Sequence, residues 1–334
     1  MRRALALSRA VLGTTSPNPP VGAVVLDASG QLVGEGATRP PGQAHAEIVA
    51  LAQAGERARG GTAVVTLEPC SHTGRTGPCT TALLAAGIAT VVVAYADPTA
   101  TAGGGAEVLR AAGVEVLTGV LTDEVGRGPL EAWLGAQRLG RPFVTWKYAA
   151  TLDGRSAAAD RTSKWITSAQ ARADVARLRS EVDAVLVGIG TVLADDPELT
   201  VRADGVAAAR QPLRVVLDSD GRTPLGAKVL DAQAETLVIS AEMAPRHDVA
   251  AALNLLAERG VVSVLLEGGP TLAAAFVRAD LVDRIIGDLA PALLGEGPQV
   301  LGSIGAATIT AAVRLRLDEV TRVGDDVRLT LRRS

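Results

Sequence analysis

The sequence predicts an α/β protein built from two domains. Its 334 residues, 48% of them hydrophobic, are about twice the length of a typical domain. Short apolar runs typical of buried strands alternate with segments of helical periodicity, which indicates layers of helices packed on largely parallel sheets. Gly140-Arg141-Pro142 interrupts the pattern near the middle. We therefore expect domains at residues 1–140 and 141–334.

The first half begins with a helix over residues 1–13 and a Pro-rich loop, Thr15 to Pro20, that excludes helix and central strand. Two strands joined by a turn at 27–30 follow as a hairpin. A helix over 44–57 is expected to carry His45 in its first turn, and a strand over 62–67 to lead into Cys70. The rest alternates as helix 80–86, strand 90–95, helix 105–112, strand 114–117 and a helical segment within 122–139.

The second half begins with a strand over 143–149, and Thr167-Ser168 is expected to cap a helix that runs to about residue 181. The last predicted strand runs into Glu267-Gly268-Gly269-Pro270-Thr271, where free N–H groups at a helix start could bind phosphate. Alone this is a weak indication, because such connections are often only turns. Gly188-Ile189-Gly190 lacks the third glycine and acidic partner of a Rossmann fingerprint. The other predicted elements are strands 184–187, 213–217, 236–239 and 261–266 and a helix over 249–258.

Charge and composition exclude some classes of partner. The formal net charge is −3, from 33 basic and 36 acidic residues, and aromatics make up only 2%, which argues against nucleic-acid binding. Residues 77–96 are uncharged and long enough to span a bilayer, but their composition better fits helix, turn and buried strand. Arg9 breaks the apolar start of the chain, which disfavours a signal peptide. We expect a cytoplasmic protein with no nucleic-acid or membrane partner.

Two short motifs contain the rarest side chains. The chain has three His and two Cys, and His45, Cys70 and Cys79 would supply the three protein ligands of a catalytic zinc ion. Glu47 follows His45 by two residues, and H-x-E with a later P-C is the zinc nucleobase-deaminase pattern. The alternatives are a disulfide or two buried thiols, a structural histidine, and a glutamate that only favours a helix start. A structural zinc site would need a fourth ligand, for which His72 is the nearby candidate.

Taken in order, the motifs resemble the bifunctional riboflavin-biosynthesis deaminase–reductase family over nearly the whole chain. Eight residues separate the two cysteines, unlike the compact C-x-x-C spacing of cytidine and tRNA-adenosine deaminases. Ala23, Gly77 and the short Ala-rich stretch 203–210 depart from the family pattern. The matching runs are Pro17-Asn18-Pro19, His45-Ala46-Glu47, Thr66 to His72 with Cys79, Leu152 to Arg155, Trp165 to Ser168, Thr191 to Pro197, Leu199 to Arg202 and Glu267 to Leu272.

The resemblance implies a cytidine-deaminase-like α/β/α domain followed by a dihydrofolate-reductase-like α/β domain. The first would use Zn²⁺ to deaminate 2,5-diamino-6-(5-phosphoribosylamino)pyrimidin-4(3H)-one, and the second would use NADPH to reduce the ribosyl group to a ribityl chain. We also expect a homo-oligomer, either a dimer or a tetramer. The competing functions are a nucleic-acid deaminase with an accessory domain and a chain whose reductase half has decayed.

Residue roles follow from the same resemblance. His45, Cys70 and Cys79 would bind zinc, Glu47 would transfer protons, and Asn18 and His72 would help to place the deaminase substrate. Asp195 is the carboxylate expected beside the reacting ribose. Ser219 and Arg222 are candidates for a 2′-phosphate contact, although the spacing does not require NADPH rather than NADH. The reductase substrate positions are Ser163, Arg179, Leu199, Arg202 and Glu267, and the NADPH positions are Ala149, Trp165, Thr191, Asp195, Ser219, Gly269, Pro270 and Thr271.

Overall fold

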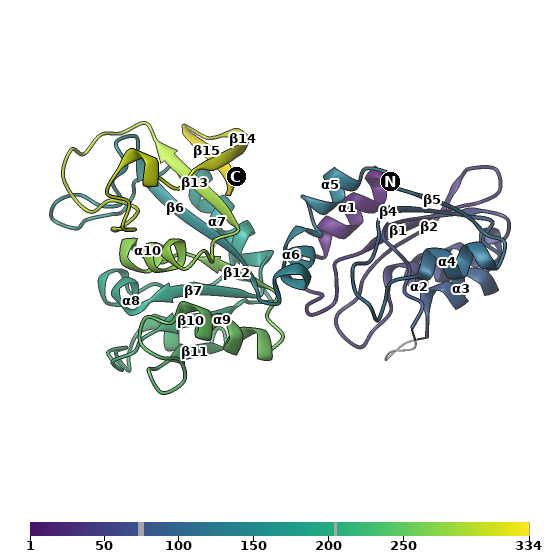
Figure 1. The fold of residues 1–334 in the computed structure, drawn as a ribbon, viewed down its shortest axis with the longest axis horizontal. Helices are drawn as coiled ribbons and strands as arrows, with labels where there is room; N and C mark the ends of the chain where they lie inside the picture. Colours follow the sequence, from purple (N-terminus) through teal and green to yellow (C-terminus); the bar gives the residue numbers. More distant parts are fainter. Residues whose placement is uncertain (73–76, 204–205, 334) are drawn as a thin grey trace. The chain divides into compact units, whose positions relative to one another are not determined.

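The computed structural model describes residues 1–72, 77–203 and 206–333. The chain divides into two compact units, Met1–Gly140 and Arg141–Ser334, shown in Figure 1. Residues 73–76 of the cysteine motif and residues 204–205 of the Ala-rich stretch lie outside the described residues.

Among the described residues of the N-terminal unit, five strands form one sheet in the order β2-β1-β3-β4-β5. β1 is antiparallel to β2 and to β3, whereas β3, β4 and β5 are parallel. The carboxyl ends of β3 and β4 therefore lie at the same edge of the sheet. The strands are β1 (Gly22–Leu26), β2 (Leu32–Ala37), β3 (Thr62–Leu67), β4 (Thr90–Tyr95) and β5 (Glu115–Thr118).

Glycines allow the helices to approach this sheet closely on both faces. A Cβ at Gly22 would lie 1.9 Å from the Ala4 carbonyl oxygen, and one at Gly36 would lie 2.1 Å from that of Ala46. Because Gly36 pairs with Ala23, Gly22 and Gly36 point to opposite faces. Figure 1 shows α2, α3 and α4 on one face and α1 and α5 on the other. The helices are α1 (Arg2–Ala10), α2 (Ala46–Ala54), η1 (Gly55–Ala58), α3 (Cys79–Ala85), α4 (Gly105–Ala111), α5 (Thr122–Gly126) and α6 (Glu131–Leu139).

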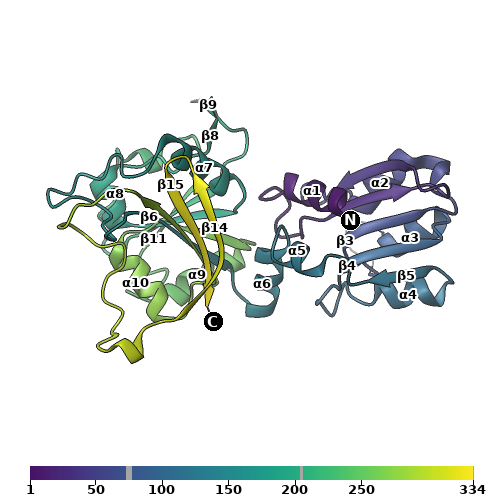
Figure 2. The same cartoon turned by 90° about the horizontal axis from the view of Figure 1, so that it is seen from above.

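In the described part of the C-terminal unit, eight strands form a sheet in the order β11-β10-β7-β12-β6-β13-β15-β14. The first six are parallel, and the β14–β15 hairpin, in yellow in Figure 2, adds two antiparallel strands. A separate short hairpin joins β8 (Arg202–Ala203) and β9 (Val206–Ala207). The sheet strands are β6 (Phe143–Thr151), β7 (Ala184–Gly188), β10 (Leu213–Leu217), β11 (Thr236–Ile239), β12 (Ser263–Leu266), β13 (Arg284–Ala290), β14 (Leu315–Val323) and β15 (Asp326–Arg333).

Helices cover both faces of this sheet, and each strand alternates its side chains between two cores. Leu186 of β7 packs into the core that includes Leu253 and Phe276, whereas Val187 packs with Leu178 and Val192 on the opposite face. The helices are α7 (Ala169–Ser180), α8 (Ile189–Asp195), η2 (Lys228–Leu230), α9 (Val249–Glu258), α10 (Pro270–Arg278) and η3 (Ile309–Ala311). In residues 1–72, 77–203 and 206–333, no helix is long and apolar enough to cross a membrane.

Two features differ from the sequence expectation. The helix expected over 44–57 begins at Ala46, so His45 is the extended residue that precedes it rather than part of its first turn. The strands β8, β9, β13, β14 and β15 were not predicted. In β14 nearly every side chain is exposed, so the apolar alternation that marks a half-buried strand is absent.

Candidate functional site

The structure brings three sulfur and nitrogen donors together at the carboxyl edge of the N-terminal sheet. His45 precedes α2, Cys70 lies in the loop after β3, and Cys79 is the first residue of α3. Nδ1 of His45 lies 3.3 Å from Sγ of Cys79 and 3.6 Å from Sγ of Cys70. A tetrahedral zinc ion needs its nitrogen and sulfur ligands about 3.6 Å apart. All three donor atoms lie within 4.8 Å of one another, so this set fits zinc.

The electrostatics of the cluster favour one thiolate. A hydrogen bond from Cys79 lowers the pKa of Cys70 to about 4, despite the opposing effect of burial. The same hydrogen bond, together with burial, raises the pKa of Cys79. The backbone N–H of Cys79 also donates to Sγ of Cys70, at 3.4 Å. Neither of these two described cysteines forms a disulfide, so both are available as ligands.

Glu47 lies in the first turn of α2, and its residue is 5% exposed. Burial raises the pKa of Glu47 to about 7, although a hydrogen bond with Cys79 acts in the opposite direction. A carboxyl group that titrates near neutral pH can both accept and donate a proton under cellular conditions. Its position beside the donor atoms therefore suits a proton-transfer role.

Asn18 and His72 are the two residues predicted to place the deaminase substrate. Asn18 is half-buried in a turn, where its N–H donates to the Thr15 carbonyl at 2.9 Å. Nε1 of Trp133 donates to the neighbouring Pro17 carbonyl at 3.2 Å, which fixes the Pro-rich loop. His72 is exposed at the border of residues 73–76, which are outside the described chain. The described contacts therefore leave the Asn18 and His72 assignments as predictions.

The C-terminal unit contains a cavity of about 730 Å³ at the carboxyl ends of its parallel strands. Dinucleotides bind at this edge of open α/β sheets, and the volume suits a cofactor-sized ligand. Among the predicted residues, those that line the cavity are Ser163, Thr191, Asp195, Ser219, Glu267, Gly269, Pro270 and Thr271.

The turn after β12 leaves open space where a phosphate would bind. Gly269 is the extended residue before α10, and Pro270 occupies the first helical turn. A Cβ at Gly269 would have Thr191 Oγ1 as its nearest neighbour, 3.9 Å away. Protein atoms therefore do not require a glycine here, whereas close approach of a ligand to the free N–H groups would. The residues thus fit the diphosphate of a dinucleotide.

Glu267 lines the cavity and forms a bidentate ion pair with Arg179 of α7. The two hydrogen bonds measure 2.7 and 2.8 Å, and the side chains are 20% and 14% exposed for Arg179 and Glu267 respectively. Arg179 also donates to the Thr200 carbonyl at 3.2 Å. Burial alone would raise the pKa of Glu267, but Arg179 lowers it overall. Arg179 therefore keeps Glu267 ionised and orients its carboxylate in the cavity.

Several predicted residues lie outside the cavity lining. Arg202 pairs with Glu198 at 2.8 Å and donates to Gln233 at 2.8 Å. The Leu199 side chain is buried in the core, so a substrate contact there would come from its backbone. Trp165 is 68% exposed, with the Arg172 guanidinium 4.3 Å from its ring centroid, and Ala149 is half-buried in β6.

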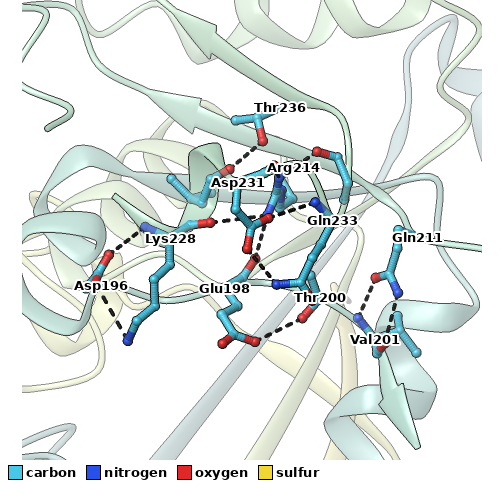
Figure 3. Close-up of polar contacts among 12 residues, drawn as sticks. Asp196, Glu198, Thr200, Val201, Gln211, Arg214, Lys228, Asp231, Gln233 and Thr236 are labelled. Atoms are coloured by element: carbon cyan, nitrogen blue, oxygen red, sulfur yellow. Dashed lines mark hydrogen bonds and ion pairs between the residues drawn. The ribbon is translucent and has the colours of Figure 1, made fainter. Parts of the chain in front are cut away.

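A buried arginine, Arg214, contacts the segment that contains Glu198 and Thr200, as Figure 3 shows. Arg214 of β10 is fully buried and donates to Asp231 Oδ1 at 2.8 Å. It also donates to the carbonyl oxygens of Glu198, Lys228, Asp231 and Ala234. One side chain thus ties the loop after α8 to the connection between β10 and β11.

Sequence reasoning missed part of the cavity wall. Asp220, which follows β10, and Arg246 and His247, in the loop between β11 and α9, line the cavity beside the predicted Arg222. These polar loop residues belong to no recognised motif. Only their position after two strands could have indicated these residues, because β10 and β11 are parallel neighbours that end at the same edge of the sheet.

The comparisons with known proteins agree with this arrangement. Residues 1–95 match the family described as cytidine and deoxycytidylate deaminase zinc-binding region, and residues 142–329 match the RibD C-terminal domain. The chain thus combines a zinc-binding deaminase region with a reductase domain of the NADPH-binding kind, and the predicted fold class is confirmed.

Full-length relatives define the family further. The riboflavin biosynthesis protein RibD of Mycobacterium tuberculosis is 51% identical over 332 residues, covering 99% of this chain and 96% of the relative. That of Escherichia coli is 40% identical over 360 residues, covering 99% and 98%. The chain belongs to the bifunctional RibD family of deaminase–reductases in riboflavin biosynthesis.

Solved structures agree over both units. RibD from Acinetobacter baumannii has a TM-score of 0.89 and 38% identity, covering 100% of this chain and 97% of that one. A diaminohydroxyphosphoribosylaminopyrimidine deaminase/5-amino-6-(5-phosphoribosylamino)uracil reductase from Thermotoga maritima has a TM-score of 0.91 and 35% identity, with the same coverage. Both predicted activities, deaminase and reductase, are therefore supported for the chain.

Proposed function

We propose that residues 1–140 form the deaminase domain and residues 141–334 the reductase domain of one bifunctional enzyme. The substrate would be 2,5-diamino-6-(5-phosphoribosylamino)pyrimidin-4(3H)-one, deaminated first and then reduced to the ribityl product. The observation that carries this proposal is the convergence of His45, Cys70 and Cys79 within 4.8 Å, beside the buried Glu47. The name of the Thermotoga maritima protein supports the choice of substrate.

In the deaminase domain, His45, Cys70 and Cys79 would hold the zinc ion. Zinc in such a site supplies a nucleophile by lowering the pKa of a water molecule towards neutrality. Glu47 would accept the proton of the attacking water and deliver it to the leaving amine, a role that its buried position beside the three donor atoms suits. Asn18 and His72 would contact the pyrimidine ribotide.

In the reductase domain, the start of α10 at Gly269, Pro270 and Thr271 would bind the cofactor diphosphate, and NADPH would supply the hydride. Asp195 would lie beside the reacting ribose, oriented by a long hydrogen bond of 3.5 Å from the Ser163 hydroxyl. Glu267, held by Arg179, would bind substrate hydroxyl groups from the cavity wall. The further positions would be Leu199 and Arg202 for substrate and Ala149, Trp165, Thr191 and Ser219 for NADPH.

We further propose a cytoplasmic homo-oligomer, a dimer or a tetramer. Two cysteines that act as metal ligands must stay reduced, which a cytoplasmic location favours. The edge strand β14 exposes Leu317 and Val320 by 53% and 57%, and open edges with apolar side chains favour pairing with another chain. Light scattering on the purified protein would test the oligomeric state.

A coupled assay tests the two activities. Purified protein would receive the diamino-pyrimidine ribotide and NADPH, and ammonia release and NADPH oxidation would be followed together with and without a zinc chelator. We expect ammonia release first and NADPH oxidation afterwards, with both lost after chelation because the second step needs the product of the first. Ammonia release without NADPH oxidation would contradict the reductase assignment.

A matched pair of glutamate variants tests the proton-transfer role. Glu47→Gln should retain zinc but lose about 10²–10⁴-fold of the deamination rate, since it cannot transfer protons. Glu56→Gln, an exposed glutamate just beyond the same helix, should leave the rate unchanged. Normal ammonia release by Glu47→Gln would remove Glu47 from the mechanism.

A further inference from the structure

A short segment of the C-terminal unit, residues 198–202, is held by side chains from distant parts of the chain. Arg179 of α7, whose ion-pair partner lines the reductase cavity, donates to the Thr200 carbonyl at 3.2 Å. Arg214 of β10 donates to the Glu198 carbonyl at 3.3 Å. Two arginines thus fix carbonyl groups of this segment beside the cavity wall.

Gln211 holds the same segment from the stretch between β9 and β10. Its Oε1 accepts the Val201 N–H at 2.7 Å, and its Nε2 donates to the Val201 carbonyl at 2.9 Å (Figure 3). Nε2 also donates to the Ala208 carbonyl at 2.9 Å, and the Ala208 N–H donates to the Val201 carbonyl at 3.0 Å. The half-buried Gln211 amide therefore joins the start and the end of the β8–β9 hairpin, much as a neighbouring strand would.

Two N–H groups in the middle of the segment have no acceptor. Leu199 and Thr200 are 3% and 5% exposed, and neither backbone N–H has a partner within residues 1–72, 77–203 and 206–333. Leu199 has a φ of 55°, a left-handed conformation that is uncommon for leucine and clusters at ligand sites. Because buried N–H groups almost always have a partner, these two indicate a ligand atom.

The donors around this segment suit an oxygen anion. Nε of Arg202 donates to Thr200 Oγ1 at 3.4 Å, so the guanidinium lies close to the Thr200 side chain. Glu198 is the carboxylate at the same place: it accepts from Thr200 Oγ1 and pairs with Arg202 at 2.8 Å, which neutralises that charge. The attraction therefore comes from directed N–H donors rather than from net charge. In the proposed substrate, the oxygen anion is the phosphate of the ribotide.

We infer that Gln211 is a positioning residue for the substrate phosphate, an inference that rests on the proposed reductase function. Gln211 acts through the backbone of the segment rather than by contact with the phosphate. By fixing Val201, it keeps the N–H groups of Leu199 and Thr200 directed at one point. The Ala-rich stretch 203–210, which departs from the family pattern, contains the hairpin that brings Gln211 to this segment.

Steady-state kinetics of Gln211→Met test this inference on the full-length enzyme. Methionine has a similar length and no charge, but it loses all three hydrogen bonds of the amide. With 5-amino-6-(5-phosphoribosylamino)uracil as substrate, KM should rise about tenfold, equivalent to about 1.4 kcal/mol. The kcat and the KM for NADPH should stay unchanged, because only binding of the phosphate is weakened.

Ribose 5-phosphate, the phosphorylated part of the substrate, serves as the probe of the phosphate site. It should inhibit the wild type competitively against the uracil ribotide, and Gln211→Met should raise its Ki by the same factor as KM. Gln211→Asn, whose amide is one carbon shorter, is a milder second variant and should change both constants in the same direction.

Gln170→Met is the matched control. Gln170 is exposed in the first turn of α7, about 14 Å along the helix from Arg179, so its loss should leave both constants unchanged. Urea unfolding of each variant verifies that the C-terminal unit remains folded.

The outcomes separate this inference from the proposed function. If the wild type oxidises NADPH and Gln211→Met keeps its KM for the ribotide, the inference is wrong and the reductase function stands. A raised KM with an unchanged Ki for ribose 5-phosphate, no inhibition of the wild type by this probe, or an equal rise in the KM for NADPH would also overturn it. Failure of the wild type to oxidise NADPH with the ribotide would overturn both proposals.

Discussion

Replacing Arg179 with methionine should destabilise the C-terminal unit strongly. The substitution would leave Glu267 with a buried carboxylate whose two hydrogen bonds, of 2.7 and 2.8 Å, are lost. Removing one partner of a buried ion pair lowers the free energy of unfolding by about 3–5 kcal/mol. Because both side chains are partly exposed, we expect a loss of about 3 kcal/mol here. For a unit of this size, that loss corresponds to a fall in Tm of about 6–12 °C.

Tryptophan fluorescence during urea unfolding measures this effect. In a Trp133→Phe background the signal comes from Trp146 and Trp165, both in the C-terminal unit. The control is Arg177→Met, two residues earlier on α7, whose side chain is 52% exposed and pairs with Asp174 and Glu181. This exposed arginine should contribute less than about 1 kcal/mol.

A double variant and a pH series sharpen the test. Arg179→Met combined with Glu267→Met should lose less stability than Arg179→Met alone, because no unpaired carboxylate remains. The pKa of Glu267 is lowered in the folded protein, so the pair stabilises the fold above the unfolded pKa of about 4.3. That stabilisation is lost as the pH falls through the lowered pKa that Glu267 has in the folded state. The difference in free energy of unfolding between the wild type and Arg179→Met should therefore shrink in acid. A deficit no larger than that of Arg177→Met would refute the reasoning.

Three further substitutions have defined expectations. Cys70→Ser should abolish zinc binding and ammonia release, because a hydroxyl is a poor zinc ligand, and metal analysis of the purified variant measures this. Gly105→Ala should lower the zinc content and reduce the free energy of unfolding by about 1–3 kcal/mol, because the added Cβ would lie 1.8 Å from the Pro69 carbonyl oxygen beside Cys70. Gly77→Ala, where the added Cβ would meet open space, is the control. Arg214→Met should lower the free energy of unfolding in urea by about 1–3 kcal/mol, because the carbonyl groups of Asp231 and Ala234 lose their buried donor, and an unchanged midpoint would contradict this.

The zinc cluster was the most predictable part of the molecule. Cysteine and histidine are rare in this chain, so the chemistry and spacing of His45, Cys70 and Cys79 alone predict a zinc ligand set. Local signals also sufficed for the start of α7, where the Ser168 hydroxyl accepts the Ala171 N–H as expected of a helix cap. Features that depend on rare residue types or on a local capping hydrogen bond can therefore be predicted from the sequence.

Features that depend on distant contacts could not be predicted. Asp288 and Arg328 belong to no sequence motif, yet Asp288 is fully buried and accepts a hydrogen bond of 2.7 Å from Arg328. Arg179, predicted as a substrate contact, also pairs with Glu267, 88 residues away, which no sequence pattern indicated. Such pairings are fixed by strand order, which the sequence patterns did not specify.

The strand order of the C-terminal sheet also determines when each unit can fold during synthesis. All strands of the N-terminal sheet lie within residues 22–118, so that sheet can form while the rest of the chain is still being translated. β6 must wait for β12 and β13, which begin at Ser263 and Arg284, more than a hundred residues later. At about 5–20 residues per second, the nascent chain exposes an unpaired apolar strand for several seconds or longer. Chaperone demand during translation should therefore concentrate on the second unit, after the first has folded.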